Sequence, residues 1–303
     1  MPEYPDLTLY LEAVEQQLLG KTLERVRIAS PFLLRTHDPK VTLLDGKALT
    51  GTRRLGKRLV FVFEGELFLV LHLMIAGRLR LRPKGEALSR KVGLAAFDFS
   101  DATLVLTEAS PKKRASLHLL RGEAALAELD AGGLEPLSTP LPAFAERMRS
   151  ENHTLKRSLT DPHLFAAIGN AYSDEILHRA QLSPVQLSQR LDDAQLARLH
   201  AAIREVLEEW TERLRKKSRG RFPEKVTAFH AEMAVHGKYG QPCPVCGTAV
   251  QRIRRAENEV NYCPQCQTGG KLLADRSLSR LLHEDWPETL EELEELKRTR
   301  RIH

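Results

Sequence analysis

Two short motifs, Cys243-Pro-Val-Cys246 and Cys263-Pro-Gln-Cys266, contain every cysteine of this 303-residue chain, and sixteen residues separate them. Each motif places two sulfur atoms on one tight turn, and two such turns can surround one ion with a tetrahedron of thiolates. A redox dithiol pair or an iron–sulfur site is the alternative, but two motifs at this separation favour zinc. The sequence therefore predicts one structural Zn²⁺ with Cys243, Cys246, Cys263 and Cys266 as its ligands.

The residues between the two motifs predict a basic hairpin. The segment 249–255 alternates apolar and polar residues, as a strand with one buried face does. It carries Arg252, Arg254 and Arg255. A small metal-bound hairpin with several arginines suits contact with a phosphate backbone.

Composition is compatible with a polyanionic partner. Lysine and arginine outnumber aspartate and glutamate by 46 to 40, which gives a net charge of +6 and a pI of about 9.2. That excess alone does not decide the partner, because the placement of the charge matters more. The chain has no apolar stretch long enough to span a bilayer and no signal-like start. Cysteines committed to metal fit a reducing compartment, so we expect a cytoplasmic protein that binds no membrane.

The first part of the chain predicts a helix followed by many short strands. Residues 6–19 have one apolar face, with Asp6 as a possible cap. From about 22 to 122 the hydrophobic period is two, which indicates a β-sandwich with an attached helix. The clearest strand pairs are 59–63 with 66–71, and 96–99 with 103–107.

The rest of the chain predicts an α+β protein of several parts. Helices are expected at 143–158, near 163–167, at 173–181 and at 193–217, and an acidic amphipathic tail runs from about 275 to 303. A proline- and glycine-rich stretch indicates a linker. The expected division is a sandwich domain at 2–130, a linker at 131–142, a helical domain at 143–220, a zinc-finger module at 221–270 and a helical extension at 271–303.

The chain begins Met1-Pro2-Glu3. Removal of the initiator methionine would leave proline first, with a secondary amine that can attack a sugar carbon and form an iminium. Most Met-Pro starts have no catalytic meaning, so this feature needs support from other segments.

That support comes from five segments in a fixed order. They are Met1–Asp6, Gly56-Lys57-Arg58, His72–Leu79, Ile168–Leu177 and the two cysteine motifs. Over residues 2–267 the chain resembles the formamidopyrimidine-DNA glycosylase and endonuclease VIII family, as an atypical member. Ile168–Leu177 is similar to that family's helix-two-turn-helix, so the resemblance implies a sandwich, a helix-two-turn-helix domain and a zinc-ribbon hairpin.

The resemblance implies a bifunctional DNA glycosylase and AP lyase of base excision repair. Such an enzyme extrudes an oxidised base from double-stranded DNA, in a basic cleft between the sandwich and the helical domain, and also acts on abasic sites. Pro2 would attack C1′ and form a Schiff base, Glu3 would act as general acid, and Lys57 would lie near the phosphates of the lesion. Cleavage would follow by β,δ-elimination. A nucleoid-associated monomer is expected.

The resemblance also implies DNA contacts. Met74 matches a residue that fills the gap left by the extruded base, although it could be a core methionine. Lys156 and Asn170 match phosphate-binding residues, and Gly169 would let the backbone approach closely. Asn258 stands where the family usually has arginine, and Arg254 or Arg255 could replace that charge. Lys113 or Arg114 could serve in the loop at 111–116, which lacks the family's aromatic residue.

These departures leave other functions open. A non-catalytic binder of damaged or abasic DNA could retain the fold without turnover. An RNA-binding zinc-ribbon protein is a third possibility, against which the Pro2-Glu3 start argues. The preferred lesion and the opposite base also stay open, because residues 218–240 lack a long glycine-rich loop.

Overall fold

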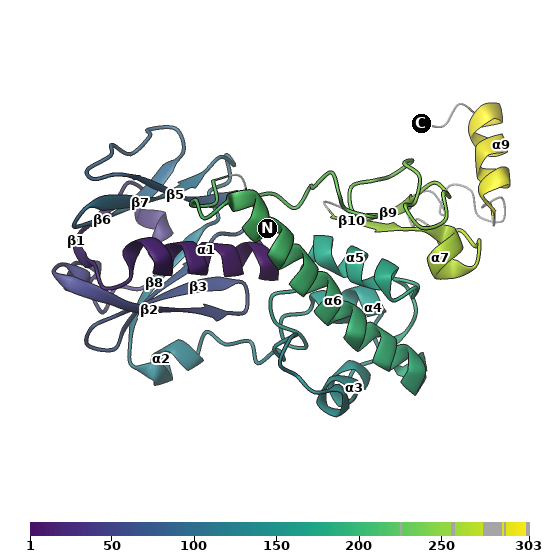
Figure 1. The fold of residues 1–303 in the computed structure, drawn as a ribbon, viewed down its shortest axis with the longest axis horizontal. Helices are drawn as coiled ribbons and strands as arrows, with labels where there is room; N and C mark the ends of the chain where they lie inside the picture. Colours follow the sequence, from purple (N-terminus) through teal and green to yellow (C-terminus); the bar gives the residue numbers. More distant parts are fainter. Residues whose placement is uncertain (225, 256–257, 275–286, 288, 301–303) are drawn as a thin grey trace. The chain divides into compact units, whose positions relative to one another are not determined.

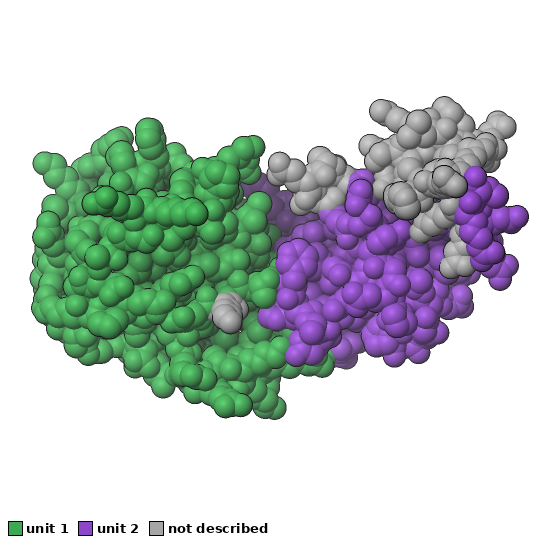
Figure 2. Space-filling view, turned by 90° about the horizontal axis from the view of Figure 1, so that it is seen from above, with its two compact units in different colours: residues 1–133, 208–228 green, residues 134–207, 229–303 purple. Residues whose placement is uncertain are grey.

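The computed structural model describes residues 1–224, 226–255, 258–274, 287 and 289–300. The chain forms two compact units, residues 1–133 with 208–228, and residues 134–207 with 229–303 (Figure 2). The finer division into five segments stays a prediction. In the part of the chain that is described, no helix combines the length and the apolar content needed to cross a bilayer.

The first unit contains one long N-terminal helix, eight strands and several short helices (Figure 1). Helix α6 also contributes its C-terminal part to this unit. The elements are α1 (Tyr4–Leu18), β1 (Thr22–Ile28), η1 (Pro31–Leu33), η2 (Val41–Leu44), β2 (Lys47–Leu55), β3 (Arg58–Phe63), β4 (Leu67–His72), β5 (Gly77–Pro83), β6 (Gly93–Phe99), β7 (Ala102–Glu108), β8 (Ser116–Arg121) and α2 (Glu123–Ala127). Helix α6 (Asp193–Ser218) is divided between the units after residue 207.

The strands form the predicted sandwich. Their order is β5-β7-β6-β1-β2-β3-β4-β8, and β1 pairs with β2 through only two residue pairs. The two four-stranded halves therefore meet at a narrow corner, and each contributes residues to one shared core, such as Phe97 from β6 and Leu69 from β4. Both predicted strand pairs are confirmed as β3 with β4 and β6 with β7.

Helix α1 begins at Tyr4, two residues before the predicted start. Glu3 occupies the N-cap position, and Asp6 is the third helical residue rather than the cap. The side chain of Asp6 accepts the backbone N–H of Glu3 at 3.0 Å, as in a capping box. Pro5 fits the first turn because the N–H it lacks has no partner inside a helix. This geometry fixes Pro2 and Glu3 at the positive end of the helix.

The segment after α6 is part of the first unit. Phe222 and Val226 pack against the core of the sandwich. Arg215, near the end of α6, pairs with Glu12 of α1 at 2.5 Å. Arg78 of β5 donates to the backbone oxygen of Val226 at 2.7 Å. These contacts hold the chain beside α1 and β5.

The second unit contains helices and the two-stranded hairpin. Two helical predictions are wrong. The predicted helix at 143–158 is interrupted at 150–154, where His153 pairs with Ser188 rather than within a helix. The helix expected near 163–167 does not form, and Ala167 has a φ of 59°, which helical residues do not adopt. The elements are α3 (Leu141–Arg149), α4 (Leu155–Thr160), α5 (Asn170–Arg179), η3 (Ser188–Arg190), β9 (Gln251–Arg255), β10 (Asn258–Tyr262), α7 (Pro264–Thr268) and α9 (Leu290–Arg300).

The acidic tail is described only in part. Helix α9 covers Leu290–Arg300. The expected extension also includes residues 275–286, 288 and 301–303, which lie outside the described residues.

Candidate functional site

The amino terminus lies in a partly buried, charged environment. Pro2 and Glu3 are both buried, and Glu3 is 3 % exposed. Burial lowers the pKa of the Met1 α-amine, the charge of Glu3 raises it, and Arg78 and Lys57 lower it further. The net direction favours the neutral amine, which is the nucleophilic form.

Asp6 adds a titratable carboxyl group beside the terminus. It is 2 % exposed, and burial raises its pKa to about 7 against the lowering effect of the Glu3 N–H bond. The charge of Glu3 raises the pKa further. Asp6 can therefore hold a proton near neutral pH.

Lys57 lies at the tip of a two-residue turn between β2 and β3. Leu55 pairs with Arg58, which leaves only Gly56 and Lys57 in the turn. Gly56 has a φ of 56°, a conformation that glycine adopts without strain. The Lys57 charge lowers the pKa of the Met1 amine, so this turn lies within electrostatic range of the amino terminus.

His72, at the end of β4, has a position that no motif in the sequence pointed to as functional. It pairs with Arg58 across the ladder. Burial lowers its pKa to about 4, and Arg58 and Lys57 add to that effect. Its Nε2 is buried and has no hydrogen-bond partner among the described residues. The neutral ring therefore keeps one N–H donor, beside the cations Arg58 and Lys57.

The turn after β4 displays apolar side chains. Gly77 donates to the backbone oxygen of Leu73 at 2.9 Å, and a Cβ at Gly77 would lie 2.2 Å from that oxygen. Met74 has a φ of 52° and is half-buried. Ile75 is 59 % exposed. The tight turn thus presents Ile75 more openly than Met74.

The loop between β7 and β8 carries the basic residues Lys113 and Arg114, both exposed. Lys113 donates to the backbone oxygens of Glu108 and of Lys91. The Glu108 carboxylate accepts the backbone N–H groups of Arg114 and Ala115. Lys113 therefore folds back onto the protein, and Arg114 is the better placed of the two for an outside partner.

In the second unit, Lys156 and Asn170 belong to one buried network. The Lys156 ammonium is 2.6 Å from the backbone oxygen of Asn170 and 2.5 Å from Asp174. Asp174 also contacts Nδ1 of His236 at 2.8 Å. The Asn170 amide donates to the backbone oxygen of Glu259 in β10 at 3.0 Å. Lys156, 9 % exposed, thus braces the start of α5 against the hairpin.

Gly169 occupies the N-cap position of α5 in an extended conformation. Its carbonyl accepts the hydroxyl of Ser173 at 2.5 Å. This hydrogen bond links the first turn of α5 to Gly169, the residue predicted to let the backbone approach DNA closely.

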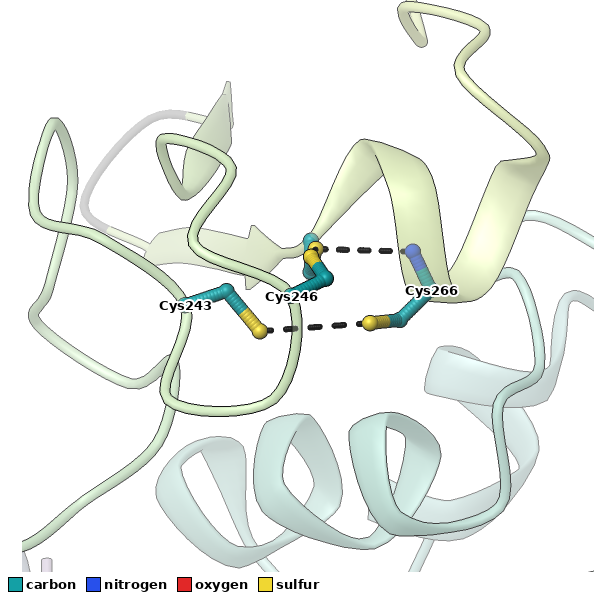
Figure 3. A group of neighbouring side chains, drawn as sticks. Cys243, Cys246 and Cys266 are labelled. Carbon is teal, nitrogen blue, oxygen red and sulfur yellow. Dashed lines mark hydrogen bonds between the residues drawn. The ribbon is translucent and has the colours of Figure 1, made fainter.

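The four cysteines form a cluster suited to zinc. Their Sγ atoms all lie within 4.8 Å of one another. Tetrahedral zinc with Zn–S bonds of about 2.3 Å separates its sulfur ligands by about 3.8 Å. Figure 3 shows Cys243, Cys246 and Cys266 converging, and the Cys243 and Cys266 sulfurs are 3.9 Å apart. The residues present fit the predicted structural zinc.

The arginines of the hairpin differ in their surroundings. Arg252 lies 3.3 Å from Glu259 and stacks over the ring of Tyr239 at 4.1 Å. Arg254 is exposed. Arg255 and Asn258 pair across the end of the hairpin, but their side chains lie outside the described residues.

Three family models match the chain in order. The formamidopyrimidine-DNA glycosylase N-terminal domain matches residues 1–117, and the H2TH domain of the same enzymes matches residues 133–219. The zinc finger found in FPG and IleRS matches residues 240–269. Together these ranges contain Pro2, Lys57, Asn170 and the four cysteines.

Curated relatives agree with the family models. The formamidopyrimidine-DNA glycosylase of Thermus thermophilus is 33% identical over 278 residues, which cover 89% of this chain and 100% of the relative. That of Listeria monocytogenes is 28% identical, with coverages of 88% and 100%. An uncharacterized formamidopyrimidine-DNA glycosylase-like protein of Mycobacterium tuberculosis is 40% identical over 151 residues, which cover 50% of this chain and 93% of the relative.

Solved structures are similar over the same part of the chain. MutM in complex with DNA containing carbocyclic 8-oxo-G has a TM-score of 0.78 at 27% identity, and covers 88% of this chain and 100% of its own. The Lactococcus lactis enzyme bound to DNA with an AP site has a TM-score of 0.77 at 25% identity, with coverages of 88% and 99%.

Proposed function

Because the chain belongs to the formamidopyrimidine-DNA glycosylase family, we propose that it is a bifunctional DNA glycosylase and AP lyase of base excision repair. Its homologues are DNA glycosylases, and solved relatives are bound to DNA with a damaged base or an abasic site. The proposed partner is accordingly double-stranded DNA with such a lesion, bound by a monomer.

The observation that carries this proposal is the environment of the amino terminus. Removal of Met1 would transfer the free amine to Pro2, which is buried beside Glu3, Asp6 and the Lys57 turn. For the Met1 amine, burial lowers the pKa against the opposing charges of Glu3 and Asp6, and Arg78 and Lys57 lower it further; we infer the same direction for a Pro2 amine in this environment. A neutral secondary amine near pH 7 is what attack on a sugar carbon requires.

The proposed reaction has two stages. The Pro2 nitrogen bonds to C1′ of the extruded nucleotide and gives up its own proton. The C1′–N bond to the base breaks, and the base leaves with the bonding electrons and takes up one proton, so that no net proton is gained or lost. Glu3 donates a proton to the ribose ring oxygen, so the ring opens and an iminium forms. Loss of a C2′ proton then expels the 3′ phosphate, and a further elimination expels the 5′ phosphate.

We assign the phosphates of the lesion to Lys57 and His72. The ring of His72 is neutral because its pKa is lowered to about 4, so one ring nitrogen can donate to a phosphate oxygen. The Lys57 charge supplies the attraction. The unpartnered Nε2 of His72 supports this role.

The gap left by the extruded base requires an apolar side chain. We propose that the turn Leu73–Gly77 supplies it, with Ile75 as the residue that reaches the duplex and Met74 behind it. The exposure of Ile75 and the positive φ of Met74 support this order. Arg114 is the proposed cation from the neighbouring loop.

In the second unit, Asn170, Gly169 and the hairpin are the proposed phosphate contacts. Lys156 is proposed to act mainly by holding Asn170. Zinc, when bound, would serve a structural role by fixing the hairpin that carries Arg254, Arg255 and Asn258.

Borohydride trapping tests the proposed function. The protein is first shown by intact mass to begin with Pro2, and is then mixed with an abasic-site duplex and a panel of single-lesion duplexes. We expect a reduced covalent adduct and strand cleavage for the wild type, and neither for Pro2→Gly. Tight salt-dependent binding without adduct or cleavage would instead identify a non-catalytic binder.

A further inference from the structure

An arginine and a tyrosine connect the first turn of α1 to the turn that carries Lys57. Tyr4 follows Glu3 as the first residue of α1. The guanidinium carbon of Arg54, in β2, lies 4.6 Å from the centre of the Tyr4 ring. Both side chains are half-buried. Stacking of a guanidinium on an aromatic face at this distance is attractive.

The same guanidinium also reaches the turn between β2 and β3. Nη1 of Arg54 donates to the backbone oxygen of Gly56 at 3.2 Å. Gly56 immediately precedes Lys57 in the two-residue turn. Arg54 thus contacts the helix that begins after Pro2 and Glu3, and also the turn whose tip is Lys57.

We propose that Tyr4 and Arg54 form a positioning pair that sets the Lys57 turn against the amino terminus for the covalent step. This inference rests on the proposed function, because it concerns the attack by Pro2. The Lys57 charge already acts on the terminal amine in the free protein. Nucleophilic attack needs reacting atoms about 3–3.5 Å apart, and a misplacement of about 1 Å can cost roughly a hundredfold in rate.

The pair is not part of the hydrophobic core. Neither residue belongs to the core of the sandwich, in which Tyr10 takes the buried aromatic position of α1. The Tyr4 hydroxyl has no hydrogen-bond partner in the part of the chain that the structure describes. The contact with Arg54 therefore depends on the ring of Tyr4, and Tyr4→Phe should preserve it.

Arg53, the neighbour of Arg54 in β2, offers a matched control. Its guanidinium lies over Phe68 at 5.4 Å and pairs with Glu123 at 2.7 Å. Loss of Arg53 removes the same charge from the same strand, and also removes a stacking contact. It leaves the contact with Tyr4 intact.

The experiment measures the single-turnover rate of adduct formation at saturating enzyme on an abasic-site duplex. An abasic site needs no base recognition, so the rate reports on the covalent step. The binding constant for the same duplex and the melting temperature are measured alongside. Full-length protein with its mass-verified N-terminal proline is used throughout.

We expect Arg54→Met and Tyr4→Leu to slow adduct formation by roughly ten- to a hundredfold, with less than a threefold change in DNA binding. Tyr4→Phe and the control Arg53→Met should stay within about threefold of wild type. Arg54→Lys keeps the charge but loses the planar stack, so it should be slow as well. The double variant should be no slower than the slower single variant, because the two residues act as a unit.

Several results would overturn the proposal. One is an adduct-formation rate equal to wild type for both Arg54→Lys and Tyr4→Leu. Another is a double variant whose rate loss is the product of the two single losses. A third is a loss confined to salt-dependent DNA binding, which would make Arg54 a phosphate contact. If Tyr4→Leu has a lowered melting temperature, the adduct-formation rate of Arg54→Lys relative to that of Arg53→Met still tests the proposal. A wild type that forms no adduct would overturn the proposed function itself, whereas unaffected pair variants with an active wild type would overturn only this inference.

Discussion

The carboxylate of Glu108 accepts the backbone N–H of Arg114 through both of its oxygens, at 3.1 and 3.0 Å. It also accepts the N–H of Ala115 at 3.1 Å. Glu108 is 1 % exposed, whereas the loop above it carries the exposed cations Lys112, Lys113 and Arg114. A buried carboxylate thus accepts backbone hydrogen bonds from an exposed basic loop and fixes its course.

Glu108→Ala should lower both stability and DNA binding. Two backbone N–H groups lose their acceptor, which costs about 1–3 kcal/mol of unfolding free energy. The loosened loop should also present Arg114 less well, so affinity for an abasic-analogue duplex should fall. Urea unfolding and binding titrations measure the two effects.

Two further variants make this test specific. Glu108→Gln keeps one acceptor oxygen, so its loss of stability and of DNA affinity should be smaller than that of Glu108→Ala. Glu123→Gln removes a surface carboxylate paired with Arg53, and should change stability by less than about 1 kcal/mol. Equal stability of Glu108→Ala and wild type would disprove the anchoring role.

His178 is predicted to hold a zinc ligand in place. Its Nε2 lies 3.3 Å from Sγ of Cys243, so a ring N–H there would donate to the thiolate. His178→Phe keeps an aromatic ring without the donor, and zinc should be lost to a chelator roughly tenfold faster. His178→Gln should recover part of the difference.

The measurement is zinc release followed with a chromogenic chelator, together with the metal content of the purified protein. His200→Phe is the control, because His200 contacts the backbone oxygen of Thr139 rather than a cysteine. Identical release from His178→Phe and wild type would show that the contact has no role in retention.

His72 should lower the stability of the free protein and strengthen its binding to DNA. Its buried Nε2 lacks a partner among the described residues, and an unsatisfied buried polar atom is costly in the free protein. His72→Leu removes that atom, so the unfolding free energy should rise by about 1 kcal/mol. The same change should weaken binding to an abasic-analogue duplex by roughly tenfold, since a hydrogen bond to a charged phosphate is lost.

Unfolding and binding are compared at one pH and salt concentration. A fall in stability and affinity together would mean that His72 is an ordinary packing residue. An unchanged affinity would remove it from the proposed phosphate site.

The sequence predicted the features that depend on local pattern. The spacing of the cysteine motifs predicted the cluster of four sulfurs, and a period of two predicted the pairing of β3 with β4. The sequence pattern did not identify the N-cap correctly, because both Glu3 and Asp6 are acidic residues that can occupy a position in a capping box. It also missed the break between α3 and α4, which depends on pairing with the distant Ser188.

The candidate site could be predicted only where a motif named it. Pro2, Glu3 and Lys57 came from resemblance, and the structure brings the Lys57 turn near the amino terminus. The roles of Glu108 and His72 depend on burial and on bonds to residues distant in sequence, which no spacing reveals. Lys156 shows the same limit, because its burial beside Asp174 emerges only from the fold.

Asp6 should make stability depend on pH in an unusual direction. Burial raises its folded pKa to about 7 from the usual 3.8 of an aspartate, so the folded state binds this proton more tightly than the unfolded chain does. The contribution of the protonated Asp6 carboxyl to the free energy of unfolding is fully present below about pH 4 and is lost as pH rises through about 7. Its size should be on the order of a few kcal/mol.

Asp6→Asn isolates this contribution. Asparagine keeps an oxygen that can accept the Glu3 N–H but has no charge to bury. The variant should match wild type near pH 4 and become the more stable protein as pH rises to 8, and subtraction of the two unfolding curves cancels other groups such as His72. Urea unfolding from pH 4 to 8, on proteins with the same N-terminal residue, gives that difference. A difference independent of pH, or a wild type more stable than the variant at pH 8, would show that Asp6 is ionised at little cost in the folded protein.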